Sequence, residues 1–462
     1  MRRRVVEQLR GRAWVTPGAV LVLALALRVV NLGRVPGYTF DEAYYVPQGW
    51  SLIRYGVERK FSEGGQDAFA RGDLDAVFTS GGDFVVHPPL GKWLIGLGEL
   101  AGPTEPWTWR ISAAIAGAII AALVTAIGVH LSGSWKWGAF AGILLAIEGT
   151  SLVQARTGIL DTFLTLFVTA GAAAALKDRD STASGWWRPW RLTAAISLGL
   201  AAGVKFSGAI FLIAYLWLVI SWDLRARQTT PEALARTARN FVLVLLPGAL
   251  AYTVTWTGWF ISPDGYGRDS RGNILSSWIH TQLGMLDLAG AINSPHQWQA
   301  APWAWLIQAR PTMFYTVTAP CRDEPGATCH QTITSLGTVP IWWLGILSVI
   351  GLGWLLARRR DSDAALVLTF FACAYLPWWF LPERTIFAFY TVAIAPFMVL
   401  AITLVLLRWH RSGSGRARFA RPAALGVGAL ALLWLISYWP VYTAAEISAD
   451  QWSQLLFWPG WQ

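Results

Sequence analysis

The sequence predicts an all-α, polytopic membrane protein, and its composition, its apolar runs and the placement of its charges all favour this fold class. Of the 462 residues, 54% are hydrophobic and only 14% are charged, whereas soluble domains carry about a quarter charged residues. Apolar runs of about 20 residues, the length that spans a bilayer as a helix, recur along the chain. A formal charge of +10 would suit a nucleic-acid binder, but the arginines cluster in short stretches between the apolar runs. No nucleic-acid partner is therefore expected.

The hydropathy pattern predicts about eleven membrane spans. They cover residues 15–33, 107–131, 137–150, 157–176, 191–204, 206–222, 240–259, 338–356, 364–381, 386–407 and 423–442. The first run follows the basic segment MRRRVVEQLRGRAW. It favours a retained span over a cleaved signal peptide, because it is long, contains Arg28 and lacks a small-residue cleavage site. With the N-terminus in the cytoplasm, nearly every Arg cluster falls inside and the C-terminus lies outside.

Two large loops between the spans are expected outside, in a single integral membrane domain that covers residues 1–462. They run over 34–106 and 261–338, and they are rich in Trp, Pro and His rather than disordered in composition. The segment PPLGKWLIGLGELAG in the first loop is too short to span, so it predicts an interfacial helix. In the second loop, Cys321 and Cys329 either form a disulfide, if the loop is extracytoplasmic, or remain free thiols.

Two adjacent carboxylates, Asp41 and Glu42, follow the first span in the segment GYTFDEAYYVPQGW. Carboxylates at a membrane surface are most often ordinary solvated charges. Here the neighbours are aromatic, and a partly desolvated setting raises the basicity of a carboxylate. The pair is therefore a candidate for a general base that accepts a proton from a hydroxyl.

Four arginines are predicted near the outer ends of spans. Arg28 lies within the first span, Arg110 begins the second, Arg156 begins the fourth, and Arg384 lies in the short turn LPERT. An Arg in an apolar helix is costly and usually has a partner or a function, although snorkelling to the interface is the alternative for Arg28. A structural ion pair with Asp161 is the alternative for Arg156. Together, fixed cations near the outer ends of the spans suit an anionic ligand such as a phosphate.

Both loops contain further candidates for substrate contacts. His87 and Lys92 lie in HPPLGKW, and His296 and Trp303 lie in SPHQWQAAPWAWLIQARP. His87 alternatively caps or packs at a loop-to-helix junction, and the tryptophans alternatively form an interfacial aromatic belt. The sequence contains no Gly-rich phosphate loop, zinc-ligand spacing or nucleophile elbow.

Arginines at outer helix ends, a carboxylate pair and no nucleotide motif together indicate transfer of a sugar from a lipid-linked phosphate. Phosphate is a good leaving group when fixed cations stabilise its developing charge. A transporter or lipid flippase is the alternative from another class. Transporters favour inverted repeats and binding sites at the bilayer midplane, and the sequence shows no internal repeat.

The order of these motifs resembles the protein O-mannosyltransferases, polytopic enzymes of the GT-C glycosyltransferase class. The matching segments, between about Arg28 and Leu400, are FDEAYY, VVHPPLGKW, WR, ARTGILDTFL, GLAAGVKFSG, SPHQWQAAPWAWLIQARP and YLPWWFLPERTIFAFYTVAIAPF. The resemblance implies an inverting transfer of mannose from a polyprenyl or dolichyl phosphate to Ser or Thr hydroxyls. It further implies that Asp41 is the base, that Glu42 supports it, and that Arg28 and Arg110 lie near the donor phosphate. Neither a cofactor nor a metal is expected.

The chain departs from the family pattern in its first loop. That loop carries the extra residues ERKFSEGGQDAFARGDLDAVFTSGGD, residues 58–83, which are called the first-loop insert below. The second loop is too short for the sugar-binding-like domain of eukaryotic members, so the resemblance is to a bacterial, actinobacterial-type member that uses polyprenyl-phosphate mannose. Such a member is expected in the plasma membrane, in contact with membrane lipids, with an extracytoplasmic active site and acceptor polypeptides emerging from the secretion translocon. A lipid or cell-wall glycan acceptor is the alternative.

Overall fold

The computed structural model is mostly helical and describes residues 2–74, 77–183, 185–224 and 230–462. The chain forms two compact units. The terminal unit comprises Met1–Arg34, Ala114–Arg156 and Ser294–Gln462, and the internal unit comprises Val35–Ala113 and Thr157–Asn293. Asp75 and Ala76 of the first-loop insert, and residues 225–229 of a predicted cytoplasmic Arg-rich segment, lie outside the described residues.

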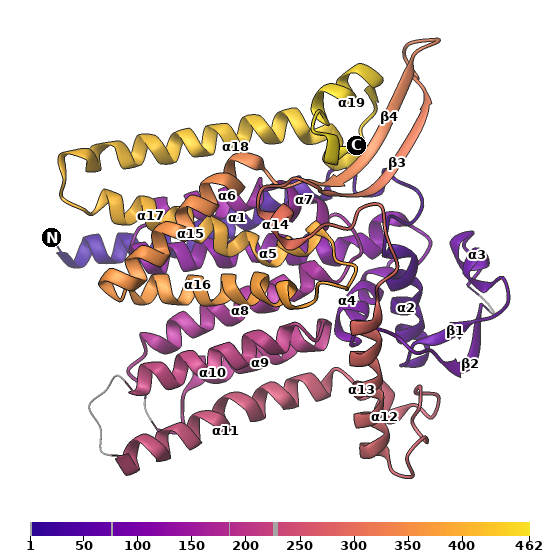
Figure 1. Cartoon of the computed structure of the whole chain (residues 1–462), viewed down its shortest axis with the longest axis horizontal. Helices are drawn as coiled ribbons and strands as arrows, with labels where there is room; N and C mark the ends of the chain where they lie inside the picture. The colour runs from indigo at the N-terminus through magenta and orange to yellow at the C-terminus, as the bar shows by residue number, and fades with distance from the viewer. Residues whose placement is uncertain (1, 75–76, 184, 225–229) are drawn as a thin grey trace. The chain divides into compact units, whose positions relative to one another are not determined.

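The terminal unit is a helical bundle with a small sheet (Figure 1). Its helices are α1 (Arg2–Val29), most of α5 (Pro106–Ser132), α6 (Trp135–Ala146), α7 (Gly149–Gln154), α14 (Pro302–Leu306), α15 (Val339–Arg359), α16 (Ser362–Tyr375), η1 (Leu376–Phe380), η2 (Ala388–Ala393), α17 (Ala395–His410), η3 (Gly415–Phe419), α18 (Ala420–Thr443), α19 (Ala449–Leu455) and η4 (Pro459–Trp461). Helix α1 packs on α6, and α17 packs against α6, α15, α16 and α18. Because α17 is surrounded in this way, most of its side chains are buried.

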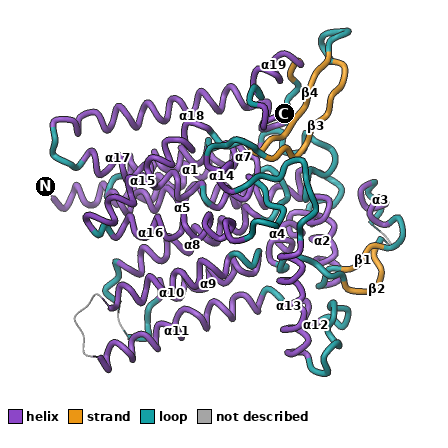
Figure 2. The backbone as a smooth tube through the Cα atoms, in the orientation of Figure 1, coloured by secondary structure: helices purple, strands orange, loops and turns teal. Residues whose placement is uncertain are grey.

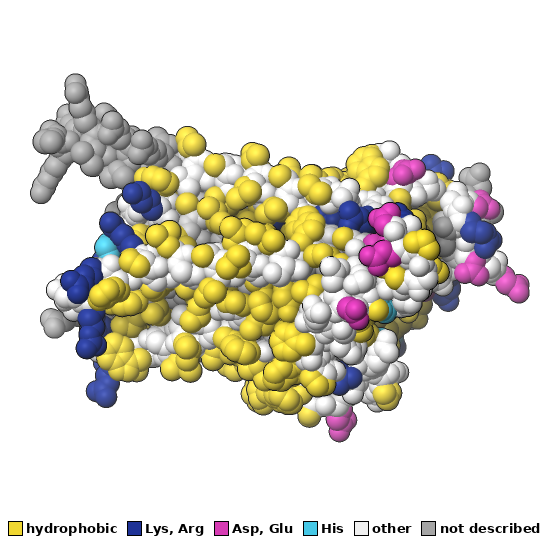
Figure 3. Space-filling model, turned by 90° about the horizontal axis from the view of Figure 1, so that it is seen from above, with side chains coloured by type: hydrophobic (Ala, Val, Ile, Leu, Met, Phe, Trp, Pro, Cys, Tyr) yellow, Lys and Arg dark blue, Asp and Glu magenta, His cyan; other side chains and the backbone are white. Residues whose placement is uncertain are grey.

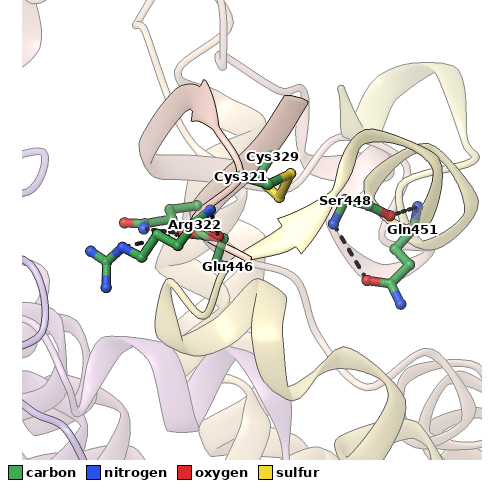
Figure 4. The surroundings of a disulfide bond; sticks show 7 residues. Cys321, Arg322, Cys329, Glu446, Ser448 and Gln451 are labelled. Carbon is green, nitrogen blue, oxygen red and sulfur yellow. Dashed lines mark hydrogen bonds and ion pairs between the residues drawn. A yellow bond between two sulfur atoms is a disulfide. The ribbon is translucent and has the colours of Figure 1, made fainter. Parts of the chain in front are cut away.

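A β-hairpin in the second loop corrects the expectation of an all-α fold (Figure 2). Strand β3 (Thr312–Pro320) pairs antiparallel with β4 (Thr328–Ser335), which pairs with the short β5 (Ile447–Ser448). The β-branched and aromatic residues of TMFYTVTA and TCHQTITS favour extended backbone. A Cys321–Cys329 disulfide closes the hairpin, and Glu446 accepts a hydrogen bond from the Arg322 backbone N–H at 3.0 Å (Figure 4).

The internal unit contains a second group of helices and a two-stranded sheet. Its elements are α2 (Glu42–Tyr55), β1 (Arg59–Phe61), α3 (Gly65–Ala70), β2 (Phe78–Gly82), α4 (Leu90–Glu99), the first residues of α5, α8 (Asp161–Arg179), α9 (Pro189–Val204), α10 (Gly208–Leu224), α11 (Thr230–Val254), α12 (Thr257–Ile261) and α13 (Ile274–Ala291). Helix α9 contacts α8, α10, α11 and α4, and α4 in turn packs on α2. The short helix predicted after His87 is therefore present as α4. It packs both on α2, near the start of the first loop, and on α9.

The structure supports a multi-pass membrane protein. Within the described residues, five helices are long and apolar enough to cross a membrane, and each of the eleven predicted spans overlaps a helix. On the face shown in Figure 3, hydrophobic side chains are spread widely over the surface. On α18, for example, Leu425, Leu433 and Ile436 are each more than half exposed, as expected for a surface that faces lipid rather than water. The number of crossings and their orientation stay predictions.

Candidate active site

The two carboxylates lie at the N-terminus of α2, in the internal unit. Glu42 is the first residue of the helix and Asp41 is its N-cap, although the Asp41 side chain makes no capping hydrogen bond. The preceding Phe40 has φ 49°, a left-handed conformation that is unusual for a bulky residue. Backbone strain of this kind concentrates at functional sites, where the surrounding structure holds it in place. The turn thus presents two adjacent carboxylates in different environments.

Glu42 is completely buried and fully hydrogen-bonded. Its two carboxylate oxygens accept from Arg110 Nε at 2.8 Å and Nη2 at 2.7 Å, and from the backbone N–H groups of Gly158 at 2.7 Å and Thr39 at 2.8 Å. Burial alone would raise the pKa of Glu42, but the Arg110 charge and these hydrogen bonds outweigh burial and hold the pKa below its usual value. Glu42 therefore stays ionised and is matched by a bidentate guanidinium.

Arg110 is itself buried, and its remaining donors hold the backbone before the carboxylates. Its Nη1 donates to the Val35 carbonyl at 2.9 Å and its Nη2 to the Gly37 carbonyl at 2.9 Å. The guanidinium therefore ties the start of α5 both to the loop that leads into α2 and to Glu42. The predicted contact of Arg110 with a donor phosphate stays a prediction, whereas its positioning contacts are present in the structure.

Asp41 is in a different electrostatic environment, and it is the carboxylate suited to exchange a proton. Burial raises the pKa of Asp41 to about 6, with an opposing effect from the Lys205 charge and a reinforcing effect from the Asp161 charge. Lys205 and Asp161 form a buried ion pair with Nζ and Oδ2 2.7 Å apart. Tyr45 Oη lies 3.5 Å from Asp41 Oδ2. A carboxylate with this pKa is ionised at neutral pH and can still accept a proton from a reacting hydroxyl.

The HPPLGKW element lies on the same unit, at the start of α4. Lys92 Nζ donates to the His87 carbonyl at 2.9 Å and forms an ion pair of 2.5 Å with Glu58 of the first-loop insert. The His87 ring lies 6.2 Å from the Tyr45 ring, centroid to centroid. Lys92 thereby fixes the loop around His87, and His87 lies beside the helix that carries the carboxylates.

Helices α2 and α4 cross at a pair of glycines. A Cβ at Gly96 would lie 2.9 Å from the Gly49 carbonyl carbon, and a Cβ at Gly49 would lie 2.9 Å from the Lys92 carbonyl oxygen. Glu99 is buried near this crossing, and neither of its carboxyl oxygens has a hydrogen-bond partner among the described residues. Burial raises the pKa of the Glu99 carboxyl well above its usual value.

Arg28 and Arg156 lie in the terminal unit, near the C-terminal end of α1. The buried Arg28 donates to the Ala24 carbonyl at 3.1 Å, to the Ala146 carbonyl at 3.3 Å and to Ser151 Oγ at 3.2 Å. Arg156 Nη1 donates to the carbonyls of Arg28 and Val30, each at 2.8 Å. Arg156 therefore caps the last carbonyls of α1, a favourable position for a cation. Asp161, the alternative ion-pair partner considered for Arg156, forms an ion pair with Lys205.

The remaining candidates of the second loop and the late turn also lie in the terminal unit. The Arg384 guanidinium lies 5.6 Å from the centre of the Trp378 ring, and the His296 ring lies 5.0 Å from the Phe387 ring. Trp303, on α14, is 59% exposed. Aromatic rings thus hold Arg384 and His296 on neighbouring segments, while Trp303 is available for contact with a lipid or a ligand.

The sequence indicates the two carboxylates but not several charged residues that the structure makes notable. It gives no role to Lys205, whose charge acts on Asp41, or to Glu58, which pairs with Lys92. It also does not single out the buried Glu99 and Glu148. Glu148 is buried, and its carboxylate accepts from the backbone N–H groups of Thr150 and Ser151. A lone acidic residue inside an apolar run, as in LIGLGELAG and LLAIEGT, was the signal that would have indicated Glu99 and Glu148.

Comparison with known proteins decides the family. A family model described as dolichyl-phosphate-mannose-protein mannosyltransferase matches residues 99–258. The polyprenol-phosphate-mannose–protein mannosyltransferase of Mycobacterium tuberculosis is 30% identical, over 99% of this chain and 93% of that protein. The chain belongs to this family. A second member, from Corynebacterium glutamicum, is also 30% identical, over 96% of this chain and 92% of that protein.

A structural comparison shows that the mannosyltransferase fold is shared with a eukaryotic protein. The structure of the S. cerevisiae protein O-mannosyltransferase Pmt1-Pmt2 complex bound to the sugar donor matches with a TM-score of 0.75, over 97% of this chain and 92% of that chain, at 12% identity. The resemblance inferred from the motifs is therefore confirmed at the level of family and fold. The roles of the individual site residues stay predictions.

Proposed function

We propose that the chain transfers mannose from polyprenyl-phosphate mannose to Ser or Thr hydroxyls of polypeptides, with Asp41 as the general base. The observation that carries the proposal is the contrast between two adjacent carboxylates. Glu42 is neutralised by Arg110 and has four hydrogen bonds, whereas the pKa of Asp41 is raised to about 6. The two full-length relatives are named for this donor and for a protein acceptor.

The proposed reaction is a single displacement. The acceptor hydroxyl transfers its proton to an Asp41 carboxylate oxygen as the hydroxyl oxygen forms a bond to the anomeric carbon. The bond from that carbon to the phosphate oxygen breaks, and its electron pair leaves with the polyprenyl phosphate. The anomeric centre inverts, so a β-linked donor gives an α-linked product. Proton acceptance by Asp41 while Glu42 remains ionised separates the two carboxylates into base and support.

Stabilisation of the leaving phosphate is assigned to arginines. Arg28 and Arg156 donate to carbonyl and hydroxyl oxygens near the end of α1, and the Arg384 guanidinium lies against an aromatic ring. Arg110 stays a candidate as well, although its charge is matched by Glu42 and its contacts hold the loop before Asp41. His87, Lys92, His296 and Trp303 are assigned to shaping the substrate loops.

The proposed location is the extracytoplasmic face of the plasma membrane, in a lipid bilayer that also holds the donor. The Cys321–Cys329 disulfide supports this orientation of the second loop, because disulfides persist in oxidising compartments. Acceptor polypeptides would reach that face as they leave the secretion translocon. Eleven crossings with the N-terminus in the cytoplasm would place both large loops there.

A reconstituted assay tests the function. Purified protein in lipid is incubated with polyprenyl-phosphate mannose and a peptide with one Thr, and the products are analysed by mass spectrometry. We expect a single added hexose on the Thr, and no product from a peptide with Val at that position. Hexose recovered only on added lipid or glycan acceptors would instead identify the alternative reaction of the same fold.

We expect transfer to proceed at an undiminished rate in excess chelator, because fixed guanidinium groups supply the positive charge at the leaving phosphate. The measurement compares initial rates before and after treatment of the reconstituted protein with EDTA. If activity is lost and added Mg²⁺ or Mn²⁺ restores it, a metal cation contributes to the reaction. That result would exclude the cofactor-free mechanism.

We expect the rate of transfer to fall as pH falls through about 6, because Asp41 must be ionised to accept a proton and burial raises its pKa to about 6. The fall in rate at low pH forms the acidic limb of the pH–rate profile. Two substitutions of residues whose charges act on Asp41 should shift this limb in opposite directions. Lys205→Gln removes a positive charge and should shift it to higher pH, whereas Asp161→Asn removes a negative charge and should shift it to lower pH. Profiles of kcat/KM against pH for the three proteins make the measurement. Identical limbs would exclude Asp41 as the titrating base.

A further inference from the structure

A pocket of about 140 Å³ lies against the loop that leads into Asp41. Tyr38 of that loop lines one side, and Trp109, which precedes Arg110 at the start of α5, lines another. The first-loop insert supplies a third side with Phe69 and Arg71. The motif resemblance marks the insert as extra residues relative to the family, and the proposed mannosyl transfer gives these insert residues no role.

The wall that the insert contributes is held by packing. Phe69 is 2% exposed, and its ring lies 6.1 Å from Phe78, which stacks on Phe61 at 5.1 Å. Gly72, also in the pocket wall, has φ 90°, and a Cβ there would lie 3.2 Å from Thr104 Cγ2. The chain therefore turns back directly after Arg71, and the aromatic cluster fixes the segment that carries the guanidinium.

The pocket offers a cation and a phenol as hydrogen-bond donors. Among the described residues, the exposed Arg71 guanidinium is in no ion pair, and Tyr38 lines the same pocket. Burial and the charges of Glu99 and Glu42 raise the pKa of Tyr38, so its hydroxyl stays protonated and can donate. A pocket with a cation and a phenol beside aromatic faces suits a carboxylate on a short apolar stem.

We propose that this pocket binds an Asp or Glu side chain of the acceptor polypeptide, close in sequence to the hydroxyl that receives the sugar. The inference rests on the proposed function, since it requires a polypeptide whose hydroxyl reaches Asp41. Tyr38 precedes Asp41 by three residues, a stretch of chain that spans at most about 11 Å. An extended acceptor covers the same distance in about three residues, so the acidic residue lies within that range of the target hydroxyl.

The test uses pairs of peptides that share one acceptor Thr and differ only by Glu or Gln, placed in turn at each of the three positions before and after it. We expect the wild-type chain to favour Glu over Gln by about three- to five-fold in kcat/KM at one of these positions, the size expected of a partly exposed ion pair. Arg71→Gln should abolish the preference and Arg71→Glu should reverse it. Lys60→Glu is the matched control, because Lys60 is an exposed cation of the same insert that does not line the pocket.

The readouts separate this inference from the proposed function. Transfer to both peptides at every position with no preference in the wild-type chain, or the same preference in Arg71→Glu, would overturn the pocket assignment and leave the mannosyl transfer standing. An increase of the KM for polyprenyl-phosphate mannose in Arg71→Gln, equal with both peptides, would assign the pocket to the donor and also overturn the inference. No transfer by the wild-type chain to any peptide would remove the proposed function and this inference with it.

Discussion

Replacing Asp41 by Asn is expected to lower the rate of mannosyl transfer by about 10²- to 10⁴-fold, the usual contribution of a general base. Asn has nearly the size of Asp, but its amide accepts no proton at neutral pH. The fold should be unaffected, because Asn is as good an N-cap residue as Asp and the Asp41 side chain makes no capping hydrogen bond. Single-turnover transfer in reconstituted membranes measures the effect on the chemical step.

Asp67→Asn provides the matched control, since Asp67 is an exposed carboxylate of the same loop. Its rate should equal that of the wild-type chain. Stabilisation of Asp41→Asn by added donor, measured by thermal unfolding, should remain, because the change affects proton transfer rather than donor binding. A rate for Asp41→Asn within three-fold of the wild-type rate would exclude Asp41 as the base.

Replacing Glu42 by Gln is expected to destabilise the protein by about 3–5 kcal/mol, because it leaves the Arg110 guanidinium buried without a counter-charge. Both residues are at most 2% exposed. Transfer should also fall steeply, since the same ion pair holds the loop before Asp41 through the Val35 and Gly37 carbonyls. Thermal unfolding in detergent, beside the transfer assay, measures the two effects.

Asp180→Asn is the control for loss of an ion pair as such. Asp180 pairs with Arg179 at an exposed position of the same unit, and exposed pairs contribute only about 0–1 kcal/mol. A double variant, Glu42→Gln with Arg110→Met, should recover part of the lost stability because it removes the unmatched charge, but it should remain inactive. If Glu42→Gln unfolds at the wild-type temperature, the pair does not stabilise this unit.

Hydropathy predicted the helices well because the apolar character of a helix depends on consecutive residues. Each predicted span overlaps a helix, and the carboxylates were found because they follow the first apolar run directly. The hairpin was missed because its strands lie in a loop without apolar periodicity. The third strand of the sheet, β5, was missed because it pairs with β4 across more than a hundred residues, through Cys329 and Ser448. Strand pairings between residues so far apart cannot be inferred from a single sequence.

The ion pairs of the site could not be predicted from the sequence for the same reason. From the sequence, Arg110 was a candidate for binding a phosphate, and Asp161 was considered only as the ion-pair partner of Arg156. The structure pairs Arg110 with Glu42, 68 residues away, and Asp161 with Lys205, 44 residues away. Which of two adjacent carboxylates retains a raised pKa depends on these pairings. The family resemblance implied that Asp41 is the base and Glu42 its support; these roles stay predictions, and the structure adds a difference in pKa between the two carboxylates.

The glycine crossing of α2 and α4 bears on how this family can diverge. Backbone meets backbone at Gly49 and Gly96, with no room for a methyl group, so no rearrangement of side chains can compensate for a larger residue at either position. A relative with Ala or Ser at one of them must hold the helix that begins at its carboxylate pair farther from the HPPL helix. Drift at these two positions therefore moves the pair relative to the HPPL element while both carboxylates stay the same.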